Sequence, residues 1–477
     1  MLSGITRNLS SEPGHDDFVQ TRPRAARAPV RRGNFTGVFG EGNGPLWLRA
    51  ERQLTVMRVL LLTNSSPLPA NNGVKMRTWS ILRALVAEGH EVVLVAFADR
   101  HELNGRHPGL SKICRRVVLV PHTFKSLSAG RDYFGRARQL LSPLPYGVRG
   151  SRSAEMAAQL AELLGQKAVD VIVSEQTDLL VNLPAPWPVP VIADFHNVDY
   201  LILERYLRFE SNPAKRLYAR LESQKWREWE RRACQLATVA IACSDHDRAL
   251  LQQLRADLPI SVVPNVVDIN EYGPGDKGDK EDAPKILFQG GMDWYPNRDA
   301  VEFFVGKIFP LVRNQIPDAK FVVAGRNPPE QFSQRLSQVP GVELTGTVPE
   351  MRVEIASATV CVVPLRIGSG TRLKILEAAA MAKPIVSTHL GAEGLKFLDG
   401  EEIMLEDVPA RFASTIVRLL NSPSERRLLG QAARKRVEQD YSFHALRASL
   451  RSAMCFLTDP RSGEAVISKC GELHGRN

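Results

Sequence analysis

The residues best suited to chemistry in this sequence lie in one segment, residues 363–378, which reads VPLRIGSGTRLKILEA. An apolar strand ends there, a loop with two glycines follows, and a helix is expected over 371–382. Glycines let a backbone approach a ligand closely, and the N-terminus of a helix carries partial positive charge that attracts phosphate. The residues that could bind an anion here are Arg366, Gly368, Ser369, Gly370, Thr371, Arg372 and Lys374.

One carboxylate follows these cations on the same helix. Lys374 and Glu377 are three residues apart, so they share a helix face, and Glu377 could hold the paired hydroxyls of a ribose. A simpler alternative is a solvated helix, capped by Ser369 or Thr371, with a Lys–Glu pair on its surface. The spacing of a Walker A phosphate loop is missing. We favour anion binding.

A second candidate group is His196, at the end of the expected strand PVIADFHN. A histidine at a strand end could donate a hydrogen bond to a substrate hydroxyl or phosphate, although a structural role is equally compatible with its position. Near the start of the chain, Asn71, Asn72 and Gly73 precede a helix and could present backbone N–H groups to an anion.

Short apolar runs alternate with amphipathic helical stretches from residue 57 onward, which is typical of βαβ units and parallel sheets. A polar segment rich in Gly and Pro, near 265–284, interrupts the alternation. We therefore predict an α/β fold with two doubly wound, Rossmann-like domains and a ligand in the cleft between them, at the strand C-termini. Strands are expected at 57–63, 91–97, 116–121, 170–175, 189–195, 239–244, 260–264, 285–290, 320–325, 342–346, 359–365, 384–388 and 402–406. The helices expected between them include one at about 198–235 and one near 298–315.

The first 55 residues differ in composition from the rest and contain eight Arg against five Asp plus Glu. No amphipathic period occurs there, so we expect a disordered basic extension, and Met57 is an alternative start of the native protein. The expected organisation is an extension (1–55), an N-terminal Rossmann-like domain (56–265), a hinge (266–284), a C-terminal Rossmann-like domain (285–440), a closing helix (441–457) and a tail (458–477).

Composition narrows the class of protein. The 477 residues are 44% hydrophobic and 24% charged, as in a folded globular protein, and the net charge of +10 favours an acidic partner. The six cysteines lack metal-ligand spacing, so we expect reduced thiols. No apolar run reaches the 18 residues of a membrane span and no secretory signal is visible, which predicts a cytoplasmic protein.

The stretch 204–232 carries nine Lys plus Arg against five Glu, with aromatic and aliphatic residues between them. It could lie on an anionic membrane as a peripheral contact, or it could be a long helix that packs one face and solvates the other. Nucleic acid is disfavoured because no helix-turn-helix, zinc-finger or RNP pattern accompanies it. The dinucleotide fingerprint is absent after strand 57–63, which disfavours a nicotinamide enzyme.

These features resemble a known family. GSGTRLKILEAAAMAKPIVSTHLGAEGL in the second domain, PNVVD at the crossover and DFHN in the first are similar to the retaining nucleotide-sugar glycosyltransferases of the GT-B fold, family four. The resemblance runs from about Met57 to about residue 455. Within this family, the sequence is most similar to sugar transferases of bacterial exopolysaccharide assembly.

The resemblance implies roles in binding the donor. Glu377 matches the glutamate that holds the donor ribose, and Ser369 occupies the place of a second family glutamate. Gly290 and Gly291 match the loop after the second domain's first strand. Many relatives have an Arg and a Lys there, whereas this chain has Gly291 and Pro296.

By the same resemblance, Arg298, Arg372 or Lys374 would supply the missing positive charge. Gly346 and Val348 lie where relatives hold the base.

On the acceptor side, His196 matches a histidine that contacts the transferred sugar, and Gly73 matches a glycine loop. Both roles are implied by the resemblance.

The implied activity is transfer of a sugar from a nucleotide-diphosphate donor to a glycan or lipid-linked acceptor with retention of configuration. No cofactor and no metal are expected, because fixed positive charges could stabilise the leaving diphosphate and no DxD-type carboxylate pair is present. Two alternatives stay open: a GT-B-fold nucleotide-sugar epimerase and a non-catalytic nucleotide-sugar binding subunit.

Overall fold

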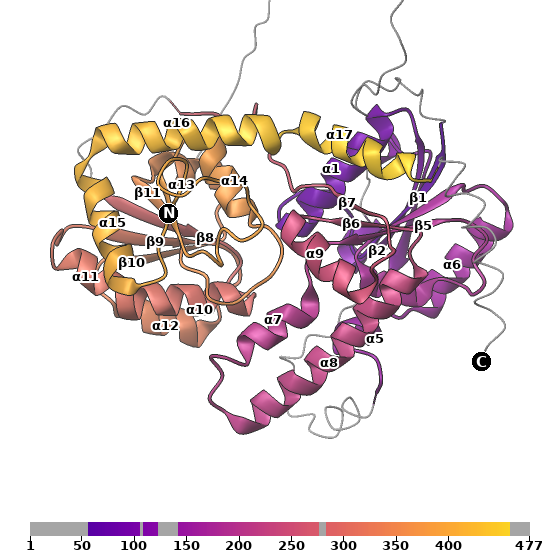
Figure 1. Cartoon of the computed structure of the whole chain (residues 1–477), viewed down its shortest axis with the longest axis horizontal. Coiled ribbons are helices and arrows are strands. Elements are labelled where there is room, and N and C mark those ends of the chain that lie inside the picture. Colours follow the sequence, from indigo (N-terminus) through magenta and orange to yellow (C-terminus); the bar gives the residue numbers. More distant parts are fainter. Residues whose placement is uncertain (1–55, 105–107, 123–141, 276–282, 458–477) are drawn as a thin grey trace, which may run out of the picture. The chain divides into compact units, whose positions relative to one another are not determined.

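The computed structural model describes residues 56–104, 108–122, 142–275 and 283–457, and shows two parallel β-sheets (Figure 1). The predicted extension and tail lie outside these residues. The first sheet contains β1 (Arg58–Thr63), β2 (Glu91–Ala98), β3 (Arg116–Pro121), β4 (Val171–Glu175), β5 (Val191–Phe195), β6 (Val239–Ala242) and β7 (Ile260–Val262). Its strand order is β3-β2-β1-β4-β5-β6-β7.

The strands of the first sheet are apolar on both faces because helices cover both sides. Along β1, Leu60 and Leu62 face one core cluster, whereas Val59 and Leu61 face the other. We call this sheet and its helices the N-terminal lobe. Its helices are α1 (Gly73–Ala87), α2 (Arg100–Asn104), α3 (Pro108–Ser111), α5 (Tyr146–Gly150), α6 (Ala154–Gly165), the 3₁₀ helix η2 (Thr177–Asn182), α7 (Asp199–Tyr206), α8 (Pro213–Leu236) and α9 (Asp245–Leu254).

The second sheet, with its helices, forms the C-terminal lobe. Its strands are β8 (Lys285–Gln289), β9 (Lys320–Ala324), β10 (Val342–Gly346), β11 (Val360–Val363), β12 (Ile385–Ser387) and β13 (Met404–Leu405), in the order β10-β9-β8-β11-β12-β13. Its helices are α10 (Tyr295–Phe303), the π-helix η3 (Phe304–Ile308), α11 (Phe309–Arg313), α12 (Glu330–Ser337), α13 (Met351–Ser357), α14 (Leu373–Ala380), α15 (Pro409–Asn421) and α16 (Pro423–Asp440).

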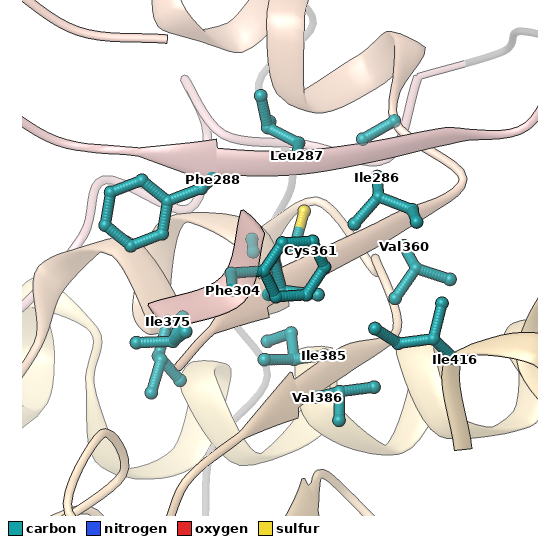
Figure 2. Packing of buried hydrophobic residues seen from close by; sticks show 14 of the residues in the cluster. Ile286, Leu287, Phe288, Phe304, Val360, Cys361, Ile375, Ile385, Val386 and Ile416 are labelled. Atoms are coloured by element: carbon teal, nitrogen blue, oxygen red, sulfur yellow. The ribbon is translucent and has the colours of Figure 1, made fainter. Parts of the chain in front are cut away.

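Aromatic rings fill the core of the C-terminal lobe. The Phe304 ring lies 4.3 Å from that of Phe321 and 6.2 Å from that of Phe412, measured between centroids. Figure 2 shows side chains of β8, β11 and β12 meeting Phe304, Ile375 and Ile416 from the surrounding helices. Both lobes are therefore doubly wound α/β units, and the predicted fold class and strands are confirmed.

The last described helix, α17 (Phe443–Cys455), returns to the N-terminal lobe. In Figure 1 the chain runs from α16 into α17, which lies beside α1. Leu446 and Leu450 of α17 share a core cluster with Ile81 and Leu85 of α1. The closing helix therefore completes the first lobe's core from the opposite end of the chain.

Two predicted helices are each divided. The helix expected over 198–235 is two helices, α7 and α8, because Asn212 caps α8 by accepting from the N–H groups of Ala214 and Lys215, and Pro213 occupies its first turn. The helix expected near 298–315 contains the π-turn η3 just before Pro310. Proline has no N–H and cannot continue the regular hydrogen-bond pattern.

We predict that Gly430→Ala destabilises the protein. A methyl group at this position of α16 would lie 2.0 Å from the carbonyl oxygen of Ala382. The backbone shift that the added methyl forces should lower the free energy of unfolding by about 2 kcal/mol and the melting temperature by about 4–8 °C. In the control Gly165→Ala, no atom lies within 4 Å of the added methyl, and the melting temperature should not fall. Equal melting temperatures for wild type and Gly430→Ala in differential scanning calorimetry would contradict the packing of α16 described above.

Candidate active site

Parallel pairing brings two carboxylates and a histidine to one edge of the first sheet. Glu175 ends β4 and pairs in register with Asp194 near the end of β5, and His196 follows two residues later. The Nε2 atom of His196 lies 3.1 Å from Glu175 Oε2 and 3.2 Å from Asp194 Oδ2. All three side chains are buried.

A buried arginine balances these carboxylates. Arg77 of α1 donates from Nη2 and Nε to the two oxygens of Asp194, at 2.6 and 2.8 Å. Its Nη1 donates to the carbonyl of Val263 and to Asn265 Oδ1, both at 3.0 Å. Arg77 therefore joins α1, β5 and the segment that follows β7.

The charges in this network keep His196 protonated. Burial alone would lower the pKa of His196, but Asp194 and Glu175 outweigh it and raise the pKa to about 9. Burial alone would raise the pKa of Asp194, but Arg77 and His196 lower it to about 2. At neutral pH His196 is thus an imidazolium, which donates hydrogen bonds from both ring nitrogens.

Glu175, Asp194 and His196 are also residue types that bind metals, and one ligand atom of each lies within 4.8 Å of the others. Arg77 already donates to both oxygens of Asp194, and the two carboxylates raise the pKa of His196, which favours an imidazolium in this arrangement. We therefore interpret the group as an ion network.

The glycine loop before α14 docks against the N-terminal lobe. Neither Ser369 nor Thr371 caps α14 as the alternative required, because the cap position is Arg372 and no side chain bonds there. Instead, Ser369 Oγ accepts from the N–H of Val198 at 3.1 Å, and Thr371 Oγ1 accepts from Asn265 Nδ2 at 2.8 Å. The hydroxyls are used to join the two lobes.

The conformation of this loop requires glycine at position 370. Gly370 has φ +71°, and a Cβ there would lie 2.6 Å from the carbonyl oxygen of His196. The adjacent Gly368 has φ +145°. Only a residue without a side chain allows the loop to approach the end of β5 this closely.

Across from this contact, Lys374 and Glu377 gather at the end of β8. Lys374 Nζ donates to Asn297 Oδ1 at 2.8 Å, and a Cβ on Gly290 would lie 2.9 Å from that Nζ. Glu377 accepts from Gln289 Nε2 at 2.6 Å. The two side chains thus have separate partners, unlike the solvated pair of the alternative interpretation.

Burial lowers the pKa of Lys374 to about 7 and raises that of Glu377 to about 7. Both residues keep some solvent exposure but are surrounded by protein. A phosphate beside Lys374 would restore its full charge, so the geometry is suited to an anion next to Gly290.

The other three predicted cations bond to partners away from Gly290. Arg298 donates to the carbonyl of Met292, Arg366 pairs with Asp299 at 2.6 Å, and Arg372 donates to carbonyls of its own loop, those of Ser369 and Gly370. Among the four predicted cations, Lys374 is therefore the one that faces Gly290.

The remaining predicted site residues lie at strand or helix ends. Gly73 begins α1, where a Cβ would lie 3.2 Å from Leu373 Cδ1, so it faces the start of α14. Gly346 ends β10 with φ +67°, and Val348 follows it. In the sheet order, β9 separates β10 from β8, so these two residues lie apart from Lys374.

Sequence reasoning missed several site residues. Arg77, Glu175 and Asp194 were not singled out, although the consecutive expected strands 170–175 and 189–195 each carry a carboxylate at the last or the second-last residue. Arg326 was also missed. It follows β9, and its Nε would lie 3.6 Å from a Cβ on Gly291, so it lies close to the loop where the family resemblance implies an arginine.

A cavity of about 380 Å³ opens beside His196. Its lining comes mainly from the N-terminal lobe, with Trp294 contributed by the C-terminal lobe. The cavity therefore lies against the ion network, where the two lobes contribute side chains together.

The chain thus has a two-domain α/β architecture, with the candidate site residues gathered at the C-terminal ends of the strands. Residues 71–271 match the family model described as "Glycosyltransferase Family 4", and residues 283–422 match "Glycosyl transferases group 1". The chain therefore belongs to the glycosyltransferases of these families, and its fold is GT-B.

Known proteins with similar sequences or folds agree with this assignment. An "Uncharacterized 44.6 kDa protein in cps region" of Klebsiella pneumoniae is 21% identical over 404 residues, covering 82% of this chain and 98% of that protein. Sucrose-phosphate synthase from Thermosynechococcus elongatus has a TM-score of 0.63 at 17% identity, covering 84% and 99% of the two chains. Anabaena HepE in complex with UDP and glucose has a TM-score of 0.59 at 14% identity, with the same coverage.

In the part of the chain that the structure describes, no helix combines the length and the apolar character needed to span a membrane.

We predict that the His196 network makes stability depend on pH. The folded pKa of about 9 exceeds the ordinary 6.5, so the contribution is fully present below pH 6.5 and is lost as the pH rises through 9. The difference between these two pKa values corresponds to about 3 kcal/mol in the free energy of folding. The melting temperature of wild type should therefore exceed that of His196→Gln most at pH 6, and the gap should shrink by pH 9.5.

The matched control is His389→Gln, which removes a histidine that pairs with Asp407 on the surface of the C-terminal lobe. Its melting temperature should follow that of wild type across the same pH range. A gap between wild type and His196→Gln that stays constant or widens with pH would show that His196 is neutral in the folded protein.

Proposed function

We propose that this protein is a retaining glycosyltransferase that moves a sugar from a nucleoside-diphosphate donor to a glycan or lipid-linked acceptor in polysaccharide biosynthesis. The observation that supports the proposal is the contact of Gly370 with the end of β5, because the glycine loop that we expect to bind an anion lies next to His196 there. Retention is carried over from the family resemblance.

The proposed mechanism follows from the charges that develop. As the bond from the anomeric carbon to the diphosphate breaks, negative charge grows on the phosphate. We assign its stabilisation to Lys374 and the backbone at Gly291, since the N–H of Gly290 already donates to the carbonyl of Ala324. Fixed donors of this kind need little reorganisation. His196 would donate to a hydroxyl of the transferred sugar. In this mechanism no metal and no cofactor take part.

The comparisons support the choice of donor and pathway. The solved structure of HepE contains UDP and glucose, and a second solved structure contains UDP-glucose, so a uridine-diphosphate sugar is the first donor to test. The relative from Klebsiella lies in a cps region, which supports a role in polysaccharide assembly.

Two other functions would use the same fold. A nucleotide-sugar epimerase would isomerise the donor, and a binding subunit would hold it unchanged. The latter is prompted by Ser369, Gly291 and Pro296, which replace charged residues of relatives. Incubation with labelled UDP-, GDP- and ADP-sugars separates the three: free nucleotide with a new glycoside, an isomerised donor, or binding alone.

With the donor found in this way, we predict that Glu377→Gln and His196→Ala each lower turnover by about 100-fold or more, since each loses a contact to the donor. The control Glu228→Gln alters an exposed carboxylate of α8 and should keep wild-type turnover. Release of nucleotide, measured by chromatography, is the readout. If both site variants turned over like the control, the site would be assigned to the wrong residues.

We further propose that the protein is cytoplasmic and contacts the inner face of the membrane through the start of α8. Lys215, Arg216 and Arg220 are exposed there beside Leu217, whose exposed fraction is 61%. A basic surface with an exposed apolar residue suits anionic lipid.

Co-sedimentation with liposomes containing phosphatidylglycerol should occur at low salt and fall at high salt. The Lys215→Glu/Arg220→Glu variant should lose it, whereas Lys307→Glu, on η3 of the other lobe, should not. Equal sedimentation of the double variant and wild type would argue against this surface.

A further inference from the structure

The chain passes from the core of the N-terminal lobe to that of the C-terminal lobe between two adjacent residues. Val266 belongs to a core cluster of the first lobe, whereas Val267 belongs to the core of the second. Ile269 and Tyr272, which follow, also pack against the core of the C-terminal lobe. This part of the connecting segment is therefore close enough to α14 to contact the candidate site residues there.

One arginine ties the connecting segment to the helix that carries Glu377. Arg434 of α16 donates from Nη1 to the carbonyl of Tyr272 and to that of Ala380, the last residue of α14, both at 2.5 Å. Its Nη2 donates to the carbonyl of Ile269 at 3.0 Å. The backbone of Tyr272 is thus fixed relative to α14.

The ring of Tyr272 is held by contacts of its own. It packs on the core of the C-terminal lobe, and the guanidinium carbon of Arg352 lies 5.9 Å from the ring centroid. A guanidinium over an aromatic face is attracted by the negative charge of that face. Arg352 also donates from Nη1 to the carbonyl of Glu271 at 3.1 Å. The ring therefore has a position that does not depend on its hydroxyl group.

The hydroxyl of Tyr272 reaches the carboxylate of Glu377. It donates to Oε1 at 3.4 Å, and Gln289 Nε2 donates to Oε2 at 2.6 Å. Each carboxylate oxygen thus has a neutral donor. An ionised carboxyl group accepts about four hydrogen bonds, so each oxygen can accept at least one more.

Two hydroxyls on adjacent carbons suit a carboxylate held in this way. The last torsion of a glutamate side chain is broad, so a carboxylate bonded at one oxygen can turn about its Cγ–Cδ bond. A donor on each oxygen fixes the plane of the group, and a fixed plane lets both oxygens face the 2′- and 3′-hydroxyls of a ribose. A 2′-deoxyribose would leave one oxygen without its hydroxyl.

We propose that Tyr272 is a positioning residue: by holding Oε1 of Glu377, it makes the site prefer a ribonucleotide to the 2′-deoxy counterpart. The inference rests on the proposed function, in which Glu377 contacts the donor. Tyr272 acts through Glu377 and not through contact with the nucleotide.

Nucleoside diphosphates test this without a sugar donor or an acceptor. The full-length protein is titrated with UDP, GDP and ADP and with their 2′-deoxy counterparts, and dissociation constants are measured by isothermal titration calorimetry at about pH 8. We call the ratio of the deoxy to the ribo dissociation constant the ribose preference. For at least one base it should be about tenfold in wild type, because the deoxy form loses a hydrogen bond to a charged group.

Two variants assign the ribose preference to the proposed residues. Glu377→Ala should reduce it to about twofold or less, and Tyr272→Phe, which keeps the packed ring, should reduce it to about threefold. Damage to the fold alone would weaken both nucleotides alike and leave the ratio unchanged.

The matched control is Tyr441→Phe in the same lobe. It removes a hydroxyl that accepts from the N–H of Lys396 at 2.7 Å. Its ribose preference should equal that of wild type even where its melting temperature falls.

The inference is overturned if Tyr272→Phe or Glu377→Ala keeps the wild-type ribose preference, or if Tyr441→Phe reduces it as far as Tyr272→Phe does. It is also overturned if wild type shows no ribose preference or binds none of the nucleotides. Failure of the proposed function would look different: the nucleotide-sugar panel would give no glycoside, while the ribose preference and its reduction in Tyr272→Phe would remain.

Discussion

The buried guanidinium of Arg77 is the group on which the arrangement of the active site depends. A charge removed from water must be paired and fully hydrogen-bonded, and losing one partner of such a pair costs about 3–5 kcal/mol. Arg77 meets this demand with Asp194, the carbonyl of Val263 and Asn265. Asn265 in turn donates to Thr371. Arg77 therefore fixes the end of β5 directly and the loop that precedes α14 through Asn265.

The two lobes were predictable from sequence because a parallel strand covered on both faces must be apolar almost throughout. Runs such as RVLLLT (β1) leave little doubt about strand or position. The positions of His196 just after β5 and of Lys374 and Glu377 on α14 agree with the predicted strand and helix, and their roles in a site stay a prediction. By contrast, the break between α7 and α8 was not predicted. Asn212 followed by Pro213 is a typical helix start, but the basic amphipathic pattern of 204–232 was interpreted as continuous.

The remaining site residues depend on tertiary partners that the sequence does not specify. A loop arginine looks the same whether it faces a ligand or, like Arg366, a carboxylate on another helix. The pairing of Glu175 with Asp194 requires that β4 and β5 be neighbours, which alternation alone leaves open. Ser369 is similar, because its hydroxyl suited a helix cap locally but bonds to Val198 in the other lobe.

The return of α17 to the first lobe has a consequence for biosynthesis. Arg447 of α17 bonds to Glu88, 359 residues earlier, and Leu446 and Leu450 cover Ile81 and Leu85. While the ribosome is still translating the second lobe, this apolar strip on α1 has no cover. The nascent N-terminal half should therefore expose this apolar surface until α17 has been translated, and a chain truncated before α17 should aggregate more readily than the full chain.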